Sequence, residues 1–347
     1  MARPPAVLAL LTRVVACAVA VSASAALAQE VQPFSVGDSL GVSGPRGFEA
    51  VSSNVAVYGA VVNAESCAYD AERGLLLVVN RGVPQAVLAN DAWVSLVRSD
   101  GSVHTPRWVG VQPPDRRAAL APPLVLNDPL GSEVAGGVLY IADRDGGASP
   151  DQPTTAVVRR FDARTGAPLG DLPIPESPWV NDVAVAADGT VYATQTGDFG
   201  PDPDSTTFRV YRIAPGGAVS VLVEGAPLDL PNGVALDSGG RIVVANSGDA
   251  AVLTFSADGV LLETRHAAQA GSDGLVVRPD GVVYVSSVFE GGVSRLRPGE
   301  PAELIASGIP GAASMCYDEA ADQLVIPMVS NNGLAFVPLG EPETDPD

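Results

Sequence analysis

The chain has 347 residues, a formal net charge of −20 at pH 7 and no lysine. So acidic a protein is a poor partner for nucleic acid or for an anionic membrane surface. The lack of lysine excludes Schiff-base chemistry and a P-loop phosphate site, which both need that side chain. Length alone allows two domains, but propellers often exceed the usual size of one domain.

The first 28 residues predict a secretory signal peptide. Two arginines flank or precede the apolar stretch VVACAVAVSASA, and the small residues AALA stand before Gln29. A lipoprotein signal that ends at Cys17 is the alternative, but Arg13 leaves too short an apolar run before it. We expect cleavage after Ala28 and a periplasmic or extracellular protein. No later segment has the 18 continuous apolar residues of a membrane span, so we expect no membrane contact after cleavage.

Six copies of one pattern follow, each a tight turn and then an apolar strand. In chain order they are RGLLLVV from Arg73, GGVLYIA from Gly136, DGTVYAT from Asp188, GGRIVVA from Gly239, DGVVYVS from Asp280 and ADQLVIP from Ala321. A short apolar strand precedes each copy. Two further strands follow every copy except the last, which is followed by one.

Four-stranded antiparallel units that repeat every 41 to 63 residues are typical of a β-propeller. We therefore predict an all-β fold, a six-bladed propeller over residues 29–340, followed by a disordered acidic tail at 341–347. The segment 49–62 can supply the missing outer strand of the last blade and close the ring. A pair of β-sandwiches is the alternative.

A polar residue with an oxygen acceptor opens the innermost strand of each unit. These residues are Glu65, Asn127, Asn181, Asn232, Asp273 and Ser314. Equivalent positions of a propeller face a common axis, so this polar ring predicts a site for a hard divalent cation. We expect Ca²⁺, with Zn²⁺, Mn²⁺ or Mg²⁺ as alternatives. Turn chemistry is the other explanation for each position alone, and it is the one we adopt for Asp182, beside Asn181.

The stretches ESCAYD, WVNDVAVAADG, LPNGVALDSGG and SDGLVVRPDG resemble the regucalcin/gluconolactonase/luciferin-regenerating-enzyme family, and the resemblance covers about residues 52–339. It implies a six-bladed propeller with a central cation that is held by Glu65, Asn232 and Asp273, with Asn181 beside the metal. It also implies hydrolysis of a lactone, in which the cation polarises the carbonyl, Asp273 is the general base and Asn181 holds substrate or water.

Two departures from the family pattern bear on the substrate. Sugar-lactone members carry an arginine two residues before the Asn-Asp pair, where this chain has Trp179. We expect a more apolar ligand or a different grip, with Trp179, Asn127 and Asn181 binding substrate. The histidine dyad of the related paraoxonases has no counterpart, because His104 and His266 fall on or just after outer strands.

The connections after the second strands of the first three units are long and rich in Gly, Pro and Asp. They predict a lid over the polar ring, with inert insertions as the alternative. Further candidates for lining the pocket are Asn80, Asp143, Asp198, Asn246 and Phe289.

Cys67 and Cys316 occupy the same repeat position in the first and last units, which are neighbours only if the ring closes. A disulfide between them would constrain the unfolded chain by roughly 4–5 kcal/mol. Two buried free thiols are an equal alternative.

These observations predict an exported, cation-dependent hydrolase that opens a lactone or a related cyclic ester and acts as a monomer. The rival hypothesis is a non-catalytic propeller that binds a small ligand or a protein and keeps a structural cation, because fold alone does not separate the two.

Overall fold

The computed structural model describes residues 37–44, 47–59, 61–83, 88–147, 149, 151–197 and 203–340. They belong to one compact unit, Pro33–Asp347. The predicted signal peptide and acidic tail lie outside the described residues. Among the described helices, none has the length and apolar character needed to cross a membrane.

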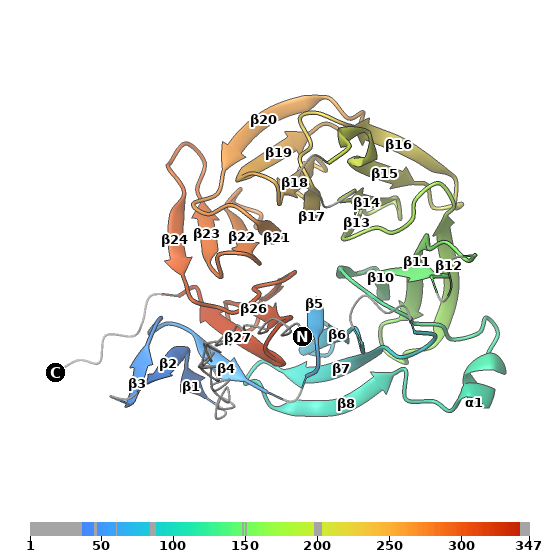
Figure 1. Cartoon of the computed structure of the whole chain (residues 1–347), viewed down its shortest axis with the longest axis horizontal. Helices are drawn as coiled ribbons and strands as arrows, with labels where there is room; N and C mark the ends of the chain where they lie inside the picture. The colour runs from blue at the N-terminus through green and yellow to red at the C-terminus, as the bar shows by residue number, and fades with distance from the viewer. Residues whose placement is uncertain are drawn as a thin grey trace, which may run out of the picture. The chain divides into compact units, whose positions relative to one another are not determined.

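Within the described residues, six antiparallel sheets of four or more strands surround a central axis (Figure 1). The first blade contains β5 (Ala64–Asp70), β6 (Leu75–Asn80), β7 (Trp93–Arg98) and β8 (Val103–Val109). The second contains β9 (Ser132–Ala135), β10 (Val138–Asp145), β11 (Thr155–Asp162) and β12 (Pro168–Ile174). The third contains β13 (Val183–Val185), β14 (Val191–Gln195), β15 (Arg209–Ile213) and β16 (Val219–Glu224).

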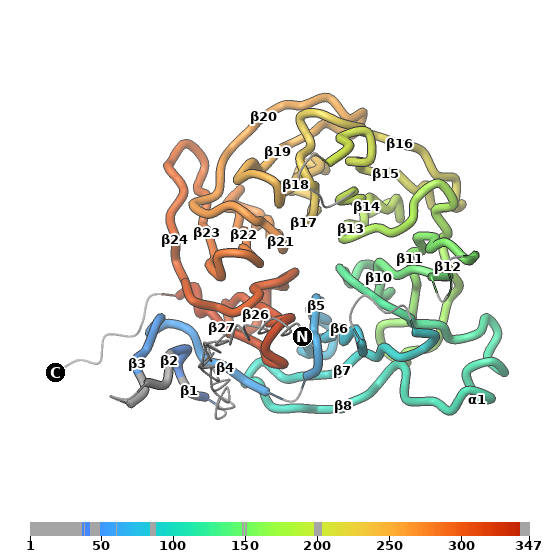
Figure 2. The backbone as a smooth tube through the Cα atoms, in the orientation of Figure 1, coloured from blue at the N-terminus to red at the C-terminus, as the bar shows by residue number. Residues whose placement is uncertain are grey.

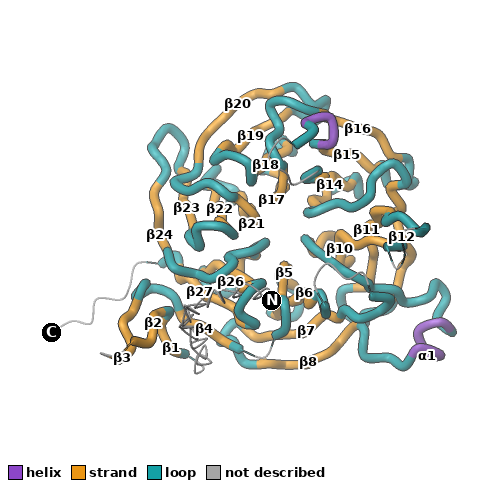
Figure 3. Tube along the Cα trace, in the orientation of Figure 1, coloured by secondary structure: helices purple, strands orange, loops and turns teal. Residues whose placement is uncertain are grey.

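The fourth blade contains β17 (Pro231–Leu236), β18 (Ile242–Asn246), β19 (Ala251–Phe255) and β20 (Leu261–His266). The fifth contains β21 (Ser272–Val277), β22 (Val283–Ser287), β23 (Val293–Leu296) and β24 (Glu303–Ala306). In the sixth, β25 (Cys316–Asp318), β26 (Gln323–Met328) and β27 (Gly333–Pro338) are joined by strands from the N-terminal side. Among the described residues, helix is limited to α1 (Pro114–Ala118) and the 3₁₀ turn η1 (Ser205–Thr207), as Figure 3 shows.

The predicted six-bladed propeller is confirmed strand by strand. Each repeat of turn and apolar strand forms the second strand of a blade, from β6 to β26. Every residue of β6, LLLVVN, is buried, because this strand lies between two neighbouring blades as well as two neighbouring strands. The outer strand β12 instead alternates exposed residues with half-buried or buried ones, as expected for a strand at the rim. Both histidines are exposed on outer strands, His104 in β8 and His266 in β20, as predicted.

The ring is closed by β4 (Ala56–Tyr58), which pairs with β27 through Val57 and Ala335. This confirms the predicted role of the segment 49–62. The sixth sheet has one more strand than predicted, because β1 (Asp38–Ser39) pairs with the free edge of β4. A two-residue strand is too short to show a periodic pattern in the sequence. A separate hairpin of β2 (Gly41–Gly44) and β3 (Gly47–Ala50) lies between β1 and β4 in the chain, which Figure 2 traces.

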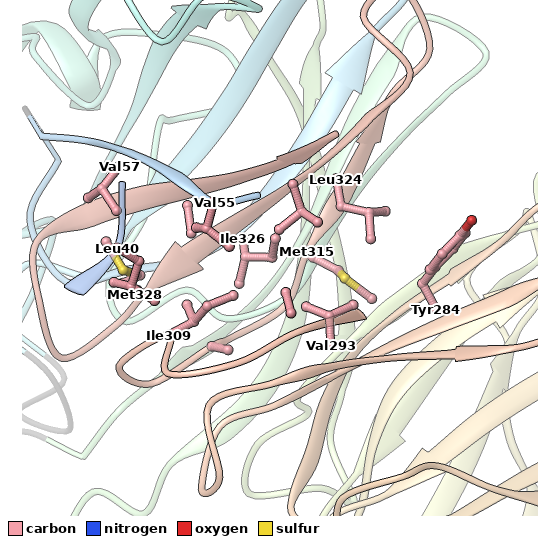
Figure 4. Packing of buried hydrophobic residues seen from close by; sticks show 14 residues of the cluster. Leu40, Val55, Val57, Tyr284, Val293, Ile309, Met315, Leu324, Ile326 and Met328 are labelled. Atoms are coloured by element: carbon pink, nitrogen blue, oxygen red, sulfur yellow. The ribbon is translucent and has the colours of Figure 1, made fainter. Parts of the chain in front are cut away.

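Apolar packing, in addition to the hydrogen bonds of β4, holds the N-terminal segment that closes the ring. Figure 4 shows side chains of this cluster: Leu40, Val55 and Val57 from the N-terminal segment, Met315, Leu324, Ile326 and Met328 from the sixth blade, and Tyr284, Val293 and Ile309 from the fifth. These residues are at most 4% exposed, so the N-terminal segment is part of the core.

A disulfide joins Cys67 of β5 to Cys316 of β25, with their Cα atoms 5.4 Å apart. The two strands also form a parallel bridge at Ser66 and Ser314. The bond therefore links the first blade to the last across the closure of the ring. Its sequence separation of 249 residues makes it a strong constraint on the unfolded chain.

Candidate functional site

Three residues of the polar ring lie in β-bulges of their inner strands. The pairing of β5 with β6 shifts between Ala64 and Ser66, so that Glu65 is the extra residue. The pairings of β17 with β18 and of β21 with β22 shift in the same way around Asn232 and Asp273. A bulge re-aims a side chain out of the regular alternation of the strand. Local strand irregularity thus sets the direction of all three side chains.

The glycines that follow Asn232 and Asp273 let neighbouring blades approach each other. A Cβ on Gly233 would lie 2.3 Å from the backbone oxygen of Asp273. A Cβ on Gly274 would lie 2.4 Å from the backbone nitrogen of Met315, in the sixth blade. Neither glycine has a positive φ, so close packing and not backbone conformation requires it. The Asn-Gly and Asp-Gly pairs therefore bring consecutive blades into backbone contact at the ring.

A hydrogen bond crosses every junction between consecutive blades in the described part of the ring. Going round, the bonds are Ser66 Oγ to Leu130 O (2.7 Å), Gly131 N to Asn181 O (2.7 Å), Thr194 Oγ1 to Asn232 O, Ser247 Oγ to Ser272 O, Ser286 Oγ to Ala313 O (2.8 Å) and Ser314 N to Glu65 O (3.0 Å). Five of the six acceptors are backbone carbonyls of ring residues or of their direct neighbours, and the sixth, Leu130 O, lies three residues after Asn127. The backbone under the polar side chains is therefore held from both sides.

Buried oxygens without a hydrogen-bond partner in the described structure mark four of the six ring residues. They are Glu65 Oε2, Asn181 Oδ1, Asn232 Oδ1 and Asp273 Oδ1. Each residue is at most 6% exposed. Buried polar atoms nearly always have a partner, so four such oxygens in one ring indicate that a ligand completes them. Carboxylate and amide oxygens are the donors that a hard cation prefers.

The two amides are oriented by bonds on their nitrogen side. Asn181 Nδ2 donates to Thr196 Oγ1 at 3.1 Å, and Asn232 Nδ2 donates to Ser247 Oγ at 3.3 Å. Because the nitrogens are used in this way, the oxygens are the atoms left over in both side chains. The four unpartnered oxygens thus come from two carboxylates and two amides. In the described residues, no group of three or more His, Cys, Asp or Glu side chains is placed to hold a metal.

The electrostatics of the ring follow from burial and from crowded carboxylates. Burial, and then the charge of Asp273, raise the pKa of Glu65 well above its ordinary value, while Arg81 lowers it in part. Burial, and then the charge of Asp182, raise the pKa of Asp273 to about 7, against the opposing effects of Arg81 and of the Asn232 amide. Without a cation, the ring therefore favours protonated carboxyl groups.

The other sequence-predicted binding residues have different surroundings. Asn127 Oδ1 accepts from the Asn90 backbone N–H at 2.9 Å, and its Nδ2 donates to Arg144 O at 3.0 Å and to Asp145 Oδ1 at 2.9 Å. Its polar atoms therefore hold neighbouring loops together. Trp179 is partly buried and packs against the apolar cluster between the second and third blades. Neither residue shares the unpartnered oxygens of the other four.

The further candidates for lining the pocket differ in burial and in hydrogen bonding. Asn80 and Asp143 are buried and hydrogen-bonded to backbone groups of their own or a neighbouring segment, through Val62 N and Asp128 N respectively. Phe289 is 68% exposed. Asp198 and parts of the long loops lie outside the described residues, so the lid stays a prediction. The first of these loops starts at the end of the blade where the polar ring lies, since Asn80 at the end of β6 pairs with Ala64 at the start of β5.

Asp182 is a blade-to-blade connector and not the turn residue that the sequence suggested. It is 5% exposed, and its Oδ2 accepts from the backbone N–H of Val234 in the next blade at 3.0 Å. Glu133 makes the equivalent contact one blade earlier, accepting from Val185 N at 2.6 Å. Burial raises the pKa of Asp182 to about 7 and that of Glu133 to about 8. The partners come from other blades, so no local sequence signal could reveal them.

A cavity of about 840 Å³ lies behind the ring, lined by the later residues of the inner strands. Asp182 and Glu133 line it, together with Tyr69, Arg278 and Tyr317. None of the four residues with unpartnered oxygens does. The cavity is therefore on the side of the ring opposite the long loops, and we do not assign the chemistry to it.

Two arginines near the ring were missed by the sequence reasoning. Arg81, directly after β6, and Arg144, near the end of β10, both form ion pairs with Asp128. The sequence offered one signal for them, their position at the ends of second strands, because those ends lie beside the ring.

The fold and the ring define a class of protein, a six-bladed propeller with an oxygen-rich site on its axis. The model of the family described as SMP-30/gluconolactonase/LRE-like region matches residues 131–329, more than half of the chain. The chain therefore belongs to this family.

Solved structures agree in fold. A gluconolactonase from Xanthomonas campestris is similar with a TM-score of 0.56 and 21% identity, over 83% of this chain and 91% of that one. A structural-genomics protein, provisionally assigned as a gluconolactonase, has a TM-score of 0.55 and 16% identity, over 82% and 92% of the two chains. No curated protein matches the chain.

Replacing Gly274 with alanine is expected to lower stability by about 1–3 kcal/mol, because the new methyl group overlaps the backbone at Ser314 and Met315. Thermal unfolding would measure this. Gly216→Ala is the matched control, since a Cβ there meets nothing within 4 Å and φ is not positive. A Gly274→Ala protein as stable as the control would contradict the close-approach role.

Proposed function

We propose that this protein is an exported, divalent-cation-dependent hydrolase that opens a lactone or a related cyclic ester. The observation that carries the proposal is the set of four buried, unpartnered oxygens on Glu65, Asn181, Asn232 and Asp273. Leaving such atoms without a partner is costly, so a ligand-bound state is favoured. Family membership and the similar fold of a gluconolactonase support the choice of reaction.

Glu65, Asn232 and Asp273 would hold the cation, with Asn181 beside it. Ca²⁺ fits such a set of carboxylate and amide oxygens better than zinc, which prefers nitrogen and sulfur ligands. When bound, the cation would supply Lewis-acid polarisation of the lactone carbonyl.

The protein's own groups account for the proton transfers. Asp273 would take a proton from the attacking water while the water oxygen bonds to the acyl carbon. The acyl carbon then releases the ring oxygen, which regains the proton, and the product is a hydroxy acid. Asn181, fixed through Thr196, would orient the water through its free Oδ1. Cation binding would lower the pKa of Asp273, which burial has raised.

Export is supported by the Cys67–Cys316 disulfide, since such bonds persist in oxidising compartments. The predicted signal peptide is consistent with it. We propose a periplasmic or extracellular protein that acts on a small molecule as a monomer.

The test is a panel of lactones of different ring size and polarity, assayed after chelation and after addition of Ca²⁺, Mn²⁺, Mg²⁺ or Zn²⁺. We expect chelation to abolish hydrolysis and one cation to restore it. A protein that binds a cation but opens no lactone would instead support the non-catalytic propeller. The hydrogen bonds across all described blade junctions favour that rival, because a cation on the axis would reinforce the same ring.

A further inference from the structure

A pair of guanidinium groups lies beside the polar ring on a single carboxylate. Asp128, whose side chain is fully buried, accepts from Arg81 Nε at 2.8 Å through Oδ1. Its Oδ2 accepts from Arg144 Nη2. Two positive side chains therefore share one buried carboxylate.

The carboxylate that pairs the two arginines is itself held rigidly. The backbone N–H of Asp128 donates to Asp143 Oδ1 at 2.8 Å. Asp143 is 2% exposed and accepts from Arg159 Nε at 2.8 Å. Arg81 and Arg144 are thus positioned before any ligand arrives, which lowers the entropic cost of binding one.

Neither guanidinium is fully used by the protein. Arg81 donates to Asp128 through Nε, and within the described residues its two terminal nitrogens have no hydrogen-bond partner. Its side chain is 10% exposed, so it is enclosed but reachable. Arg144 Nε is buried and also lacks a partner. These nitrogens are therefore available to donate to a ligand.

Arg81 is close enough to the proposed cation ligands to act on them. Its charge lowers the pKa of both Glu65 and Asp273. Burial lowers the pKa of Arg81, but the Asp128 hydrogen bond and the charges of Glu65 and Asp273 together raise it above its ordinary value. Arg81 is therefore a charged group beside the proposed cation ligands.

We propose that Arg81 and Arg144 bind a carboxylate on the substrate, so that the protein acts on lactones that carry a second, anionic group. The inference rests on the proposed function. A guanidinium matches a carboxylate in planar, two-bond geometry, and the pair has free donors for it. The two arginines would also replace the substrate-binding arginine that the family pattern places at the position of Trp179.

The test compares two substrates that differ in charge at one group, 5-oxotetrahydrofuran-2-carboxylate and 5-oxotetrahydrofuran-2-carboxamide. We expect kcat/KM to favour the carboxylate by about 10- to 100-fold, the effect of a charge-assisted hydrogen bond. Arg81→Met should bring the ratio close to one, and Arg81→Lys should keep part of the preference. Arg116→Met, which changes an exposed arginine of α1, is the matched control and should keep the ratio of the unaltered protein.

A binding measurement separates this inference from the proposed function. Calorimetric titration of 2-hydroxyglutarate, the product of the anionic lactone, is made on cation-free and on cation-loaded protein. We expect Arg81→Met to weaken binding at least about 10-fold in both forms. If the Met variant does not fold, Arg81→Gln replaces it, with circular dichroism as the check.

Equal kcat/KM for the two lactones would overturn the inference and leave the proposed function standing. No hydrolysis with any cation, but arginine-dependent binding of 2-hydroxyglutarate, would reject the proposed function and keep the carboxylate site. Binding that is absent, or that is unchanged in the Arg81 variants, would overturn the inference.

Discussion

Replacing Asp273 with asparagine is expected to lower kcat/KM for the best lactone by about 10²- to 10⁴-fold, the usual contribution of a general base. Asparagine keeps the size of the side chain and one oxygen, but it cannot take a proton and carries no charge. We therefore also expect weaker cation binding, because one of two ring carboxylates is lost. Steady-state kinetics at saturating cation and a cation titration followed by calorimetry measure the two effects separately.

Asp258→Asn is the matched control for this variant. Asp258 is exposed in the turn between β19 and β20, the two outer strands of the fourth blade. It should change neither kinetics nor cation binding. Full activity of Asp273→Asn at saturating cation would contradict the role of Asp273 as general base. Unchanged cation affinity would contradict its role as a cation ligand.

The cation-free protein is expected to lose stability as the pH rises from about 4 to about 7. The cause is the pKa of Asp273, raised from 3.8 to about 7, together with the raised pKa of Glu65. Well below pH 4 both groups are protonated in the folded and the unfolded chain, so stability is undiminished. Between the two pKa values the unfolded chain releases protons that the folded chain keeps, so the free energy of unfolding falls. For Asp273 alone the loss is about 4 kcal/mol at most.

A saturating cation should cancel this part of the loss, because it takes the place of the protons in the ring. Asp182 and Glu133 also have raised pKa values and produce a slope of the same sign, but they are not proposed ligands. The difference in stability with and without cation should therefore grow from pH 5 to pH 7. Denaturant unfolding at several pH values measures it.

Glu133→Gln is a suitable control for the pH experiment. It removes one raised pKa on the cavity side of the ring and should make the slope of both curves less steep. The difference that the cation causes should stay the same. A cation-free protein whose stability is constant or rises between pH 5 and pH 7 would contradict the burial of charged carboxyl groups in the ring.

The ring is built by backbone features more than by its side chains. Bulges at Glu65, Asn232 and Asp273 turn these residues out of the strand pattern, and Gly233 and Gly274 let consecutive blades touch. Hydrogen bonds then hold the backbone at each junction. The side chains can therefore be buried with unpartnered oxygens, because the surrounding contacts prevent them from turning toward other partners.

Several parts of the molecule were accessible from sequence because their signals are local. A run such as LLLVVN shows a buried strand by its composition, and turns such as Asp-Gly mark its start. Six repetitions show the propeller, because each blade carries its own copy. The positions of Glu65, Asn181, Asn232 and Asp273 follow from the same alignment of repeats, and the cation set itself came from the family resemblance.

The contacts between blades were not accessible in this way. Asp182 was assigned to a turn, although its partner is Val234, 52 residues later in the next blade. Whether Cys67 and Cys316 are bonded was left open until the closed ring brought their Cα atoms to 5.4 Å. Arg81 carries no motif, and its relation to Asp128 and Glu65 exists only once β6 and the second blade are side by side.

The sequence by itself determined the repeat, the strands of each blade and the polar position at the start of each inner strand. Hydrophobic alternation and turn residues act within a few residues, so they can be read along the chain. Tertiary structure alone decided which polar atoms stay without a partner, which carboxylates connect blades and where Arg81 and Arg144 meet Asp128. Those outcomes depend on which blades become neighbours and how closely they pack. Such contacts join residues that are far apart in the chain, so no short stretch of sequence shows them.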